Sequence, residues 1–101
     1  GSISVSHDDQ IMAYSVDLKG SEYYDIFLRD LSTNQILEKK IENTSGSITW
    51  SLDSKSFFYI PLDKYHRSKK IYKHILGTSI NKDQDLINES INLLKILEEK
   101  S

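Results

Sequence analysis

One stretch of this chain approaches the spacing of a catalytic serine. Residues 77–81 read Gly-Thr-Ser-Ile-Asn, which matches the Gly-x-Ser-x-Gly pattern of a nucleophile elbow except at the last position. In such an elbow the glycines let a helix pass close to a strand, and the serine hydroxyl stays exposed. Asn81 replaces the second glycine, and no clear elbow helix follows. We therefore interpret Ser79 as a turn residue and predict no catalytic residue in this chain.

Histidine is a second side chain that could act in acid–base or metal chemistry. The chain contains His7, His66 and His74. None of them has a carboxylate and a nucleophile placed in the sequence so as to complete a catalytic group. We therefore predict surface or loop positions for these histidines, rather than catalytic or metal-binding roles.

Acidic residues also fail to form a recognisable metal site. Pairs occur at residues 8–9 (Asp-Asp) and at Asp83 and Asp85, but the remaining oxygen ligands of a calcium loop are missing. The chain contains no cysteine, which excludes disulfides and thiolate metal sites. We predict neither a bound metal nor a cofactor.

One group of cationic side chains could bind phosphate or an acidic peptide. It comprises Lys64, Arg67, Lys69, Lys70 and Lys73, with His66 and His74 nearby. The formal net charge of the chain is -2, so acidic residues elsewhere cancel this cluster. We interpret the cluster as a solvated loop and strand edge, and we expect no nucleic-acid binding.

The elements that must position these side chains follow an internal repeat. Residues 1–3 (Gly-Ser-Ile) recur as residues 46–48, an offset of 45 positions (46 − 1 = 45). The same offset, without a gap, relates Ser6 to Ser51, Asp8 to Asp53, Tyr14 to Tyr59, Ile26 to Ile71, Leu31 to Leu76 and Thr33 to Thr78. A period of about 40–45 residues, with several short strands in each unit, is typical of β-propeller blades.

Short apolar runs separated by turn residues predict four strands in each unit. In the first unit they cover residues 3–6, 11–16, 23–31 and 36–41. In the second unit they cover residues 48–51, 56–60 and 69–76, with a weak fourth strand from about Ile80. Trp50 and residues 57–59 (Phe-Phe-Tyr) could stack on bases or sugars, but their counterparts Val5 and residues 12–14 favour core packing.

The end of the chain changes its hydrophobic period. Apolar residues follow helical spacing over residues 86–99, with Asp85 as the N-cap or Asp83 as a second choice. This helix could bind a groove on a partner, or it could cover an open edge of the same chain. The predicted fold is mostly β, with two antiparallel four-stranded blade-like units of an incomplete propeller at residues 1–45 and 46–84, and an amphipathic helical tail at residues 85–101.

Several segments, taken together, resemble one known family. They are residues 13–17, 23–24 with Ile26, 28–31, 41–50, 62–63, 66–67, 70–74 and 76–78. In order and spacing over about residues 1–89 they are similar to the propeller of oligopeptidase B (protease II), in the prolyl oligopeptidase family of serine peptidases. After Glu89 the helical pattern departs from that family, which predicts a truncated or split gene or a cloned fragment.

The resemblance implies part of a filter domain and not a catalytic domain. Family members join a seven-bladed propeller to an α/β-hydrolase domain with a Ser-Asp-His triad, and they cleave oligopeptides after Lys or Arg. The chain alone is therefore expected to lack catalysis. Incomplete blades favour homo-oligomers through exposed edges and the helix, and the alternative function is a stand-alone interaction or self-assembling module.

The remaining expectations concern the cell. The sequence has no apolar run of about 20 residues and no signal-like start, so we expect no membrane span and a cytoplasmic location. Its richness in lysine and isoleucine is typical of AT-rich coding sequence and predicts a bacterial source.

Overall fold

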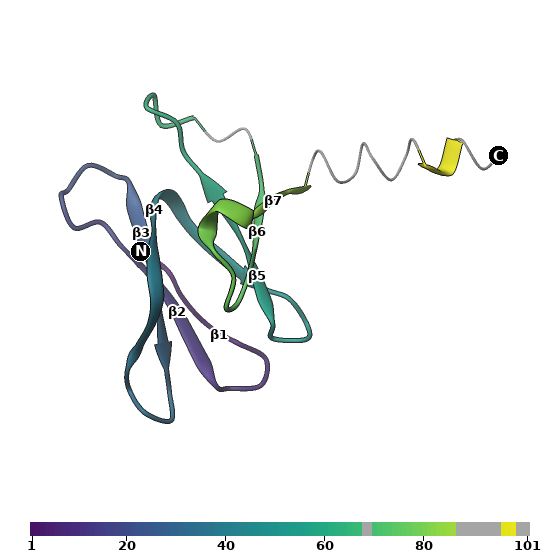
Figure 1. The fold of residues 1–101 in the computed structure, drawn as a ribbon. Coiled ribbons are helices and arrows are strands. Elements are labelled where there is room, and N and C mark those ends of the chain that lie inside the picture. Colours follow the sequence, from purple (N-terminus) through teal and green to yellow (C-terminus); the bar gives the residue numbers. More distant parts are fainter. Residues whose placement is uncertain (68–69, 87–95, 99–101) are drawn as a thin grey trace.

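The computed structural model describes residues 1–67, 70–86 and 96–98. Within them, strands form one antiparallel meander in which each strand pairs with the next along the chain (Figure 1). The strands are β1 (Ile3–Val5), β2 (Ile11–Val16), β3 (Tyr24–Asp30), β4 (Ile36–Trp50), β5 (Ser56–Pro61), β6 (Tyr72–Ile75) and β7 (Gln84–Asp85). A 3-10 helix, η1 (Ile80–Lys82), precedes β7. The mostly β fold class is therefore confirmed.

The 45-residue repeat is visible in the backbone at the first turn of each unit. Ser6 Oγ donates to Asp8 Oδ1 over 2.6 Å, and Ser51 Oγ donates to Asp53 Oδ1 over the same distance. The next residue has a φ of 60° in the first turn (Asp9) and 61° in the second (Ser54). The sequence repeat thus encodes the same turn twice, because short polar side chains stabilise left-handed backbone by local hydrogen bonds.

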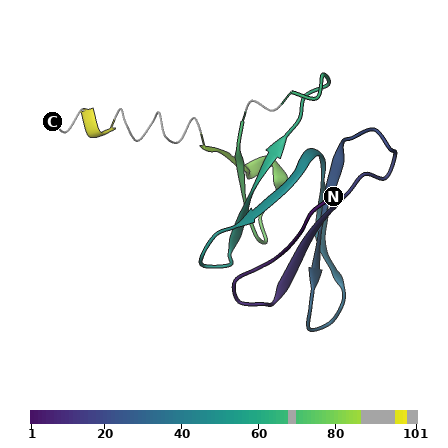
Figure 2. The same cartoon turned by 180° about the vertical axis from the view of Figure 1, so that it is seen from behind.

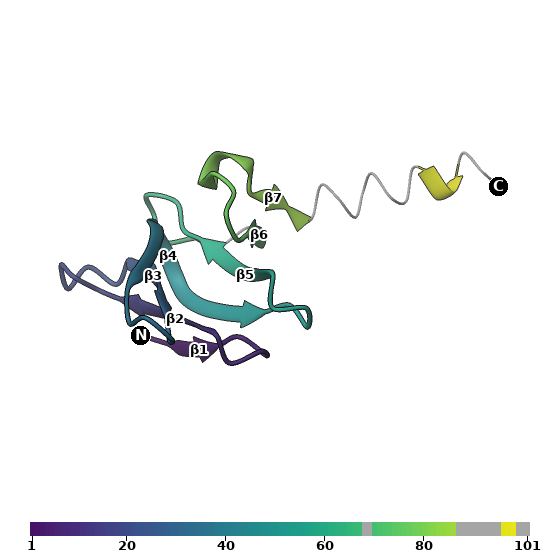
Figure 3. The same cartoon turned by 60° about the horizontal axis from the view of Figure 1, so that its bottom comes forward.

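Strand β4 belongs to both units. Its first half pairs with β3 and its second half with β5, and Thr44 pairs with Tyr24 on one side and with Pro61 on the other. Register shifts interrupt both ladders, and Figure 3 shows the strand bending between the two halves of the sheet. The sequence predicted separate strands at residues 36–41 and 48–51, but the structure joins them into one.

Gly46 lets the chain pass closely through this bend. Its φ is +90°, and a Cβ atom placed there would lie 3.0 Å from Cγ of Tyr24. Its carbonyl accepts a 2.9 Å hydrogen bond from Ser15 Oγ, and its N–H donates to Thr44 Oγ1 over 3.0 Å. Glycine is required here because the position combines left-handed backbone with tight packing.

The core lies between the two units, which pack face to face (Figures 1 and 2). Alternate residues of each strand point to one face, and the inner faces form one cluster: Ala13, Ile26, Leu28, Ile41, Trp50, Phe57 and Tyr59. Trp50 anchors the contact, because its Nε1 donates to the Ser4 carbonyl over 2.9 Å. Trp50, Phe57 and Tyr59 are all buried, which confirms the prediction that they pack in the core. Phe58 is half-buried and faces the opposite side, so its prediction as core was wrong.

The end of the second unit differs in part from the prediction. The third strand was expected at residues 69–76 but covers Tyr72–Ile75; residues 68–69 lie outside the described ones. The predicted helix falls mainly on residues 87–95 and 99, which also lie outside them, while Leu86 and residues 96–98 are helical. Asp85 lies in β7 directly before Leu86, and Asp83 ends η1. The boundary at residues 45/46 falls inside β4, and the division into domains stays a prediction.

Candidate functional site

The most polar cluster of the interior is centred on His74 of β6. Its Nδ1 lies 2.7 Å from Asp83 Oδ1, and its Nε2 lies 3.0 Å from Glu38 Oε1. The other oxygen of Asp83 accepts a hydrogen bond from the Tyr59 hydroxyl. Both ring nitrogens of His74 therefore face a carboxyl oxygen, and the imidazole lies between two acidic side chains. We call these four residues the His74 cluster.

Burial makes the His74 cluster a strong structural contact. The side chains of His74 and Asp83 are 2% and 1% exposed, whereas that of Glu38 is 23% exposed. Burial, together with the neighbouring Asp83 carboxylate, raises the pKa of Tyr59 above its ordinary value. The Tyr59 hydroxyl therefore keeps its proton and remains a donor to Asp83.

Glu38 connects the first unit to the second. It lies on β4 where the pairing with β3 is shifted, and its φ is +55°. A bulge of this kind redirects a side chain. While Oε1 faces His74, Oε2 accepts a 3.0 Å hydrogen bond from the Gly77 N–H. Glu38 thus holds both β6 and the following turn against the first unit.

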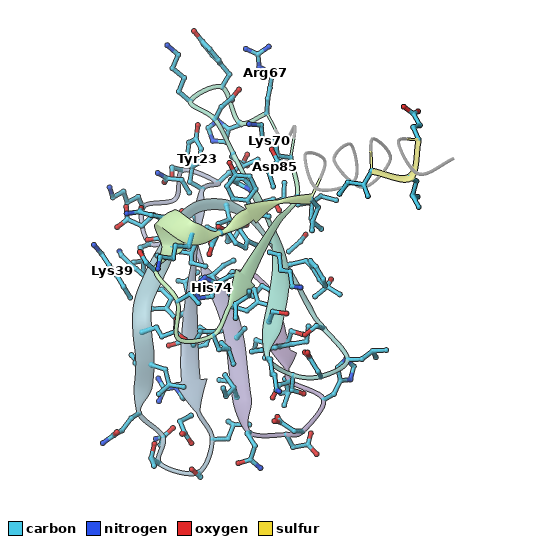
Figure 4. The ribbon with its side chains drawn as sticks, turned by 45° about the vertical axis from the view of Figure 1, so that its right-hand side comes forward. Tyr23, Lys39, Arg67, Lys70, His74 and Asp85 are labelled. Carbon is cyan, nitrogen blue, oxygen red and sulfur yellow. The ribbon has the colours of Figure 1, made fainter. Side chains whose placement is uncertain are left out.

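The His74 cluster was not predicted from the sequence. His74 was expected on the surface or in a loop, and that prediction was wrong, because β6 turns the imidazole into the contact between the units. A signal was available in the repeat: the two carboxylates occupy equivalent positions, since Asp83 follows Glu38 by 45 residues (83 − 38 = 45). Figure 4 shows His74 in the interior, whereas Lys39, next to Glu38, lies at the outside of β4.

An open groove of about 780 Å³ runs beside the His74 cluster, between β4 and residues 77–81. Lys39 and Lys40 line it together with Glu38 and Glu42, and Lys40 is paired with Asp25 at 3.0 Å. Charges of both signs therefore line the groove, which gives it no preference for an anion or a cation.

The His74 cluster holds the two units together, and it lacks the arrangement of a peptidase active site. Among the described residues, no serine or threonine hydroxyl hydrogen-bonds to His74, whereas a nucleophile must lie within reach of its base. Ser79 caps η1, where its hydroxyl accepts a hydrogen bond from the Asn81 N–H, as expected of a turn residue.

The other histidines occupy surface loops, as predicted. His7 is exposed in a turn. His66 is exposed in the loop between β5 and β6, where its ring stacks on Tyr23 with centroids 3.8 Å apart. Its Nε2 also lies 2.8 Å from the Ser21 carbonyl. His66 thereby links loops of the two units at one end of the sheet.

The described cations of the predicted cluster make local contacts with their own neighbours. The cations of Lys64 and Arg67 lie 5.1 and 4.8 Å from the ring centroid of Tyr65, and Arg67 is 3.6 Å from Asp63. Lys70 is 3.5 Å from Asp85, and Lys69 lies outside the described residues. Figure 4 shows Arg67 at the tip of its loop and Lys70 beside Asp85. These local pairs support the interpretation as a solvated loop and edge.

The described residues contain neither a metal site nor a membrane-spanning helix. In residues 1–67, 70–86 and 96–98, no group of His, Cys, Asp and Glu is placed to hold a metal ion. The same part of the chain contains no helix of the length and apolar character needed to cross a membrane.

Two repeated antiparallel units, stacked face to face and related by a constant offset, define the chain as part of a β-propeller. It belongs to the prolyl oligopeptidase family: the model described as "Prolyl oligopeptidase, N-terminal beta-propeller domain" matches residues 1–98. This corrects the expectation that the family resemblance ends after Glu89, because the match continues to within three residues of the chain's end.

Similar proteins agree with this assignment. Dipeptidyl aminopeptidase BI of Pseudoxanthomonas mexicana is 32% identical over 82% of this chain, and Protease 2 of Moraxella lacunata is 26% identical over 93%. Oligopeptidase B from Leishmania major superposes on 85% of this chain with a TM-score of 0.80 and 30% identity. Oligopeptidase B from Trypanosoma brucei, with covalently bound antipain, gives 0.72 and 33% over the same share.

The chain corresponds to a small part of each of these proteins. It spans 12% of the Pseudoxanthomonas protein and 14% of the Moraxella protein. It likewise covers 12% of each oligopeptidase B chain. In this family the propeller is packed with a catalytic domain.

Proposed function

We propose that this chain supplies part of the propeller of a serine endopeptidase that cleaves oligopeptides after Lys or Arg. The observation that carries the proposal is the face-to-face packing of two repeat units, which superposes on oligopeptidase B from Leishmania major with a TM-score of 0.80. The chain itself contributes no catalytic residue. It helps to limit access of large substrates to an α/β-hydrolase domain, which is its partner.

The His74 cluster serves this role by holding neighbouring blades in a fixed orientation. A propeller that filters substrates must keep its blades from separating, and Glu38 joins the two units through His74 and the Gly77 N–H. We further propose a cytoplasmic location and a bacterial source, in keeping with a peptidase of short peptides and with the composition of the chain.

Affinity capture from the source cells tests the proposal. An antibody raised against this chain should capture a protein several-fold larger than 101 residues that hydrolyses fluorogenic peptides after Arg or Lys. Peptides with Ala or Leu at that position serve as the matched control, and a serine-reactive phosphonate should abolish the activity. A captured protein of this chain's own size without hydrolysis would contradict the proposal.

A second candidate function is self-assembly, with the chain acting as an interaction module. It is favoured by apolar side chains exposed on strands of the sheet, such as Ile3 (75% exposed) and Val5 (42%), both in β1. Exposed apolar faces and open edges promote association. A homodimer or larger assembly is expected on this hypothesis, and sedimentation of the purified chain over a range of concentrations tests it.

A further inference from the structure

Each unit has an inner face, packed on the other unit, and an outer face that the described residues leave open. The first outer face is formed by Val5, Met12, Tyr14, Phe27 and Arg29. The second outer face is formed by Thr49, Phe58, Ile60, Ile71 and Leu86. Each is hollowed by an open groove, of about 420 Å³ on the first and about 350 Å³ on the second.

The repeat shows what kind of surface fits each outer face. Adding 45 to the residues of the first outer face gives the inner face of the second unit: Trp50, Phe57, Tyr59, Tyr72 and His74. Subtracting 45 from the second outer face gives the inner face of the first unit: Ser4, Ala13, Ser15, Ile26 and Ile41. The outer faces are therefore equivalent to two surfaces that already bind each other inside the chain.

The equivalence extends to the backbone of these faces. In the first unit Ile26 pairs with Ile41 across β3 and β4. Ile71 and Leu86 are the residues that follow Ile26 and Ile41 by 45 positions. They are joined in the second unit, where the Leu86 N–H donates to the Ile71 carbonyl over 2.9 Å. The second outer face thus has the strand pairing of a surface that binds a blade.

The outer faces carry large and small side chains at the opposite positions from the contact inside the chain. Inside the chain the large Trp50 bonds the Ser4 carbonyl, next to the small Ala13, which is the cross-strand partner of Ser4. At the outer faces the small Val5 replaces Trp50, while the large Phe58 replaces Ala13. The two changes compensate in volume, and volume-conserving exchanges are those that packed contacts tolerate best.

We propose that a second copy of this chain docks its first outer face onto the second outer face, head to tail. The contact reproduces the packing between the two units of one chain. The proposal rests on the self-assembly hypothesis and makes it more specific. Two defined sheet faces form the contact, in place of the exposed edges and the helical tail expected from the sequence. Because the two faces differ, the contact is heterologous: each docked copy leaves one face open for another.

Charge sets a condition on this contact. Each outer face carries one cation, because Arg29 pairs with Met12 on the first and Lys73 pairs with Phe58 on the second. Docking two faces that both carry positive charge is opposed by repulsion. Salt screens such repulsion, with a Debye length of about 8 Å at physiological ionic strength. The association should therefore strengthen as salt is raised, unlike one that depends on ion pairs.

The test uses one variant for each face and their mixture, followed by sedimentation velocity. Val5→Lys alters the first outer face and Ile71→Lys the second, at positions that are 42% and 44% exposed. Each variant alone should lose self-association by about tenfold or more, because the added cation would be buried against a face that already carries a cation. Mixed together they should form a heterodimer, because one contact still joins two intact faces, and that heterodimer should not grow further.

A variant outside both faces serves as the matched control. Leu52→Lys, at an 88% exposed apolar position in a turn outside both faces, should associate like the unchanged chain. Circular dichroism of each variant checks that it folds. Association that persists in both variants would overturn the proposed faces while leaving self-assembly intact. A chain that stays monomeric at all concentrations and salt levels would overturn both.

Discussion

The two units share their turns but differ in their faces. The turn at Asp8 and the turn at Asp53 have the same serine-to-aspartate hydrogen bond, and each has a residue with left-handed backbone at the next position. By contrast, the buried Phe57 of the second unit corresponds to the half-buried Met12 of the first. Turn chemistry is thus conserved between the units because it acts locally, whereas face residues vary with what they pack against.

The largest effect should come from removing an aromatic ring of the core. Phe57→Ala is expected to cost about 3–5 kcal/mol of unfolding free energy, since Phe57 is 0% exposed. Met12→Ala, its counterpart on the first outer face, should cost much less. Urea denaturation of both variants measures the difference, and equal losses would refute the contrast between the faces.

Loss of the central imidazole should come next. His74→Ala leaves the buried carboxyl of Asp83 without its imidazole partner, and an unsatisfied buried polar group costs about 1–3 kcal/mol, or more where the group is charged. Arg29→Ala, one repeat earlier, should change stability by about 0.5 kcal/mol at most. Thermal denaturation of the pair is the measurement, and a stable His74→Ala chain would show that the cluster does not fasten the units.

A smaller effect is expected where the chain bends. Gly46→Ala forces a side chain into left-handed backbone and onto the Tyr24 ring, at a cost of about 1–3 kcal/mol. Gly20→Ala provides the control, because its φ is also positive (+67°) but nothing lies within 4 Å of the added Cβ. Similar losses in the two variants would mean that backbone strain, and not the packing of the bend, is responsible.

The smallest effect should appear in acid, and it should appear in both units. Hydrogen bonds from Ser6 and from Ser51 hold the pKa values of Asp8 and Asp53 below the usual 3.8. A lowered folded-state pKa gives stability that is complete above 3.8 and is lost as the pH falls below it. Asp8→Asn and Asp53→Asn should each reduce this acid dependence slightly in denaturation curves at pH 2–5. A reduction in only one of the two variants would contradict the equivalence of the two turns.

Local signals in the sequence predicted most of the fold. Alternating apolar residues and polar turns located β1, β2, β3, β5 and the two ends of β4 closely, because both signals act over a few residues. The continuity of β4 could not be predicted, since Asn43 and Gly46 are turn-forming residues and do have positive φ values, of 60° and 90°. Tertiary pairing of Thr44 on both sides keeps the strand extended there.

The His74 cluster was beyond reasoning from local sequence. His74 and Glu38 are 36 positions apart, and their contact requires the bend of β4 together with the positive φ of Glu38. A comparison of the repeats could have singled out Glu38 and Asp83 as equivalent carboxylates. It could not have shown that both turn toward the same imidazole.

The sharing of strand β4 by both units determines how the molecule unfolds. In repeat arrays whose units keep their own strands, stability is a sum of unit and interface contributions, and units can be lost one at a time. Here one continuous strand is the last of the first unit and the first of the second. Neither unit can melt without taking the shared strand from the other, so we expect one cooperative transition, with amide protons along β4 among the slowest to exchange.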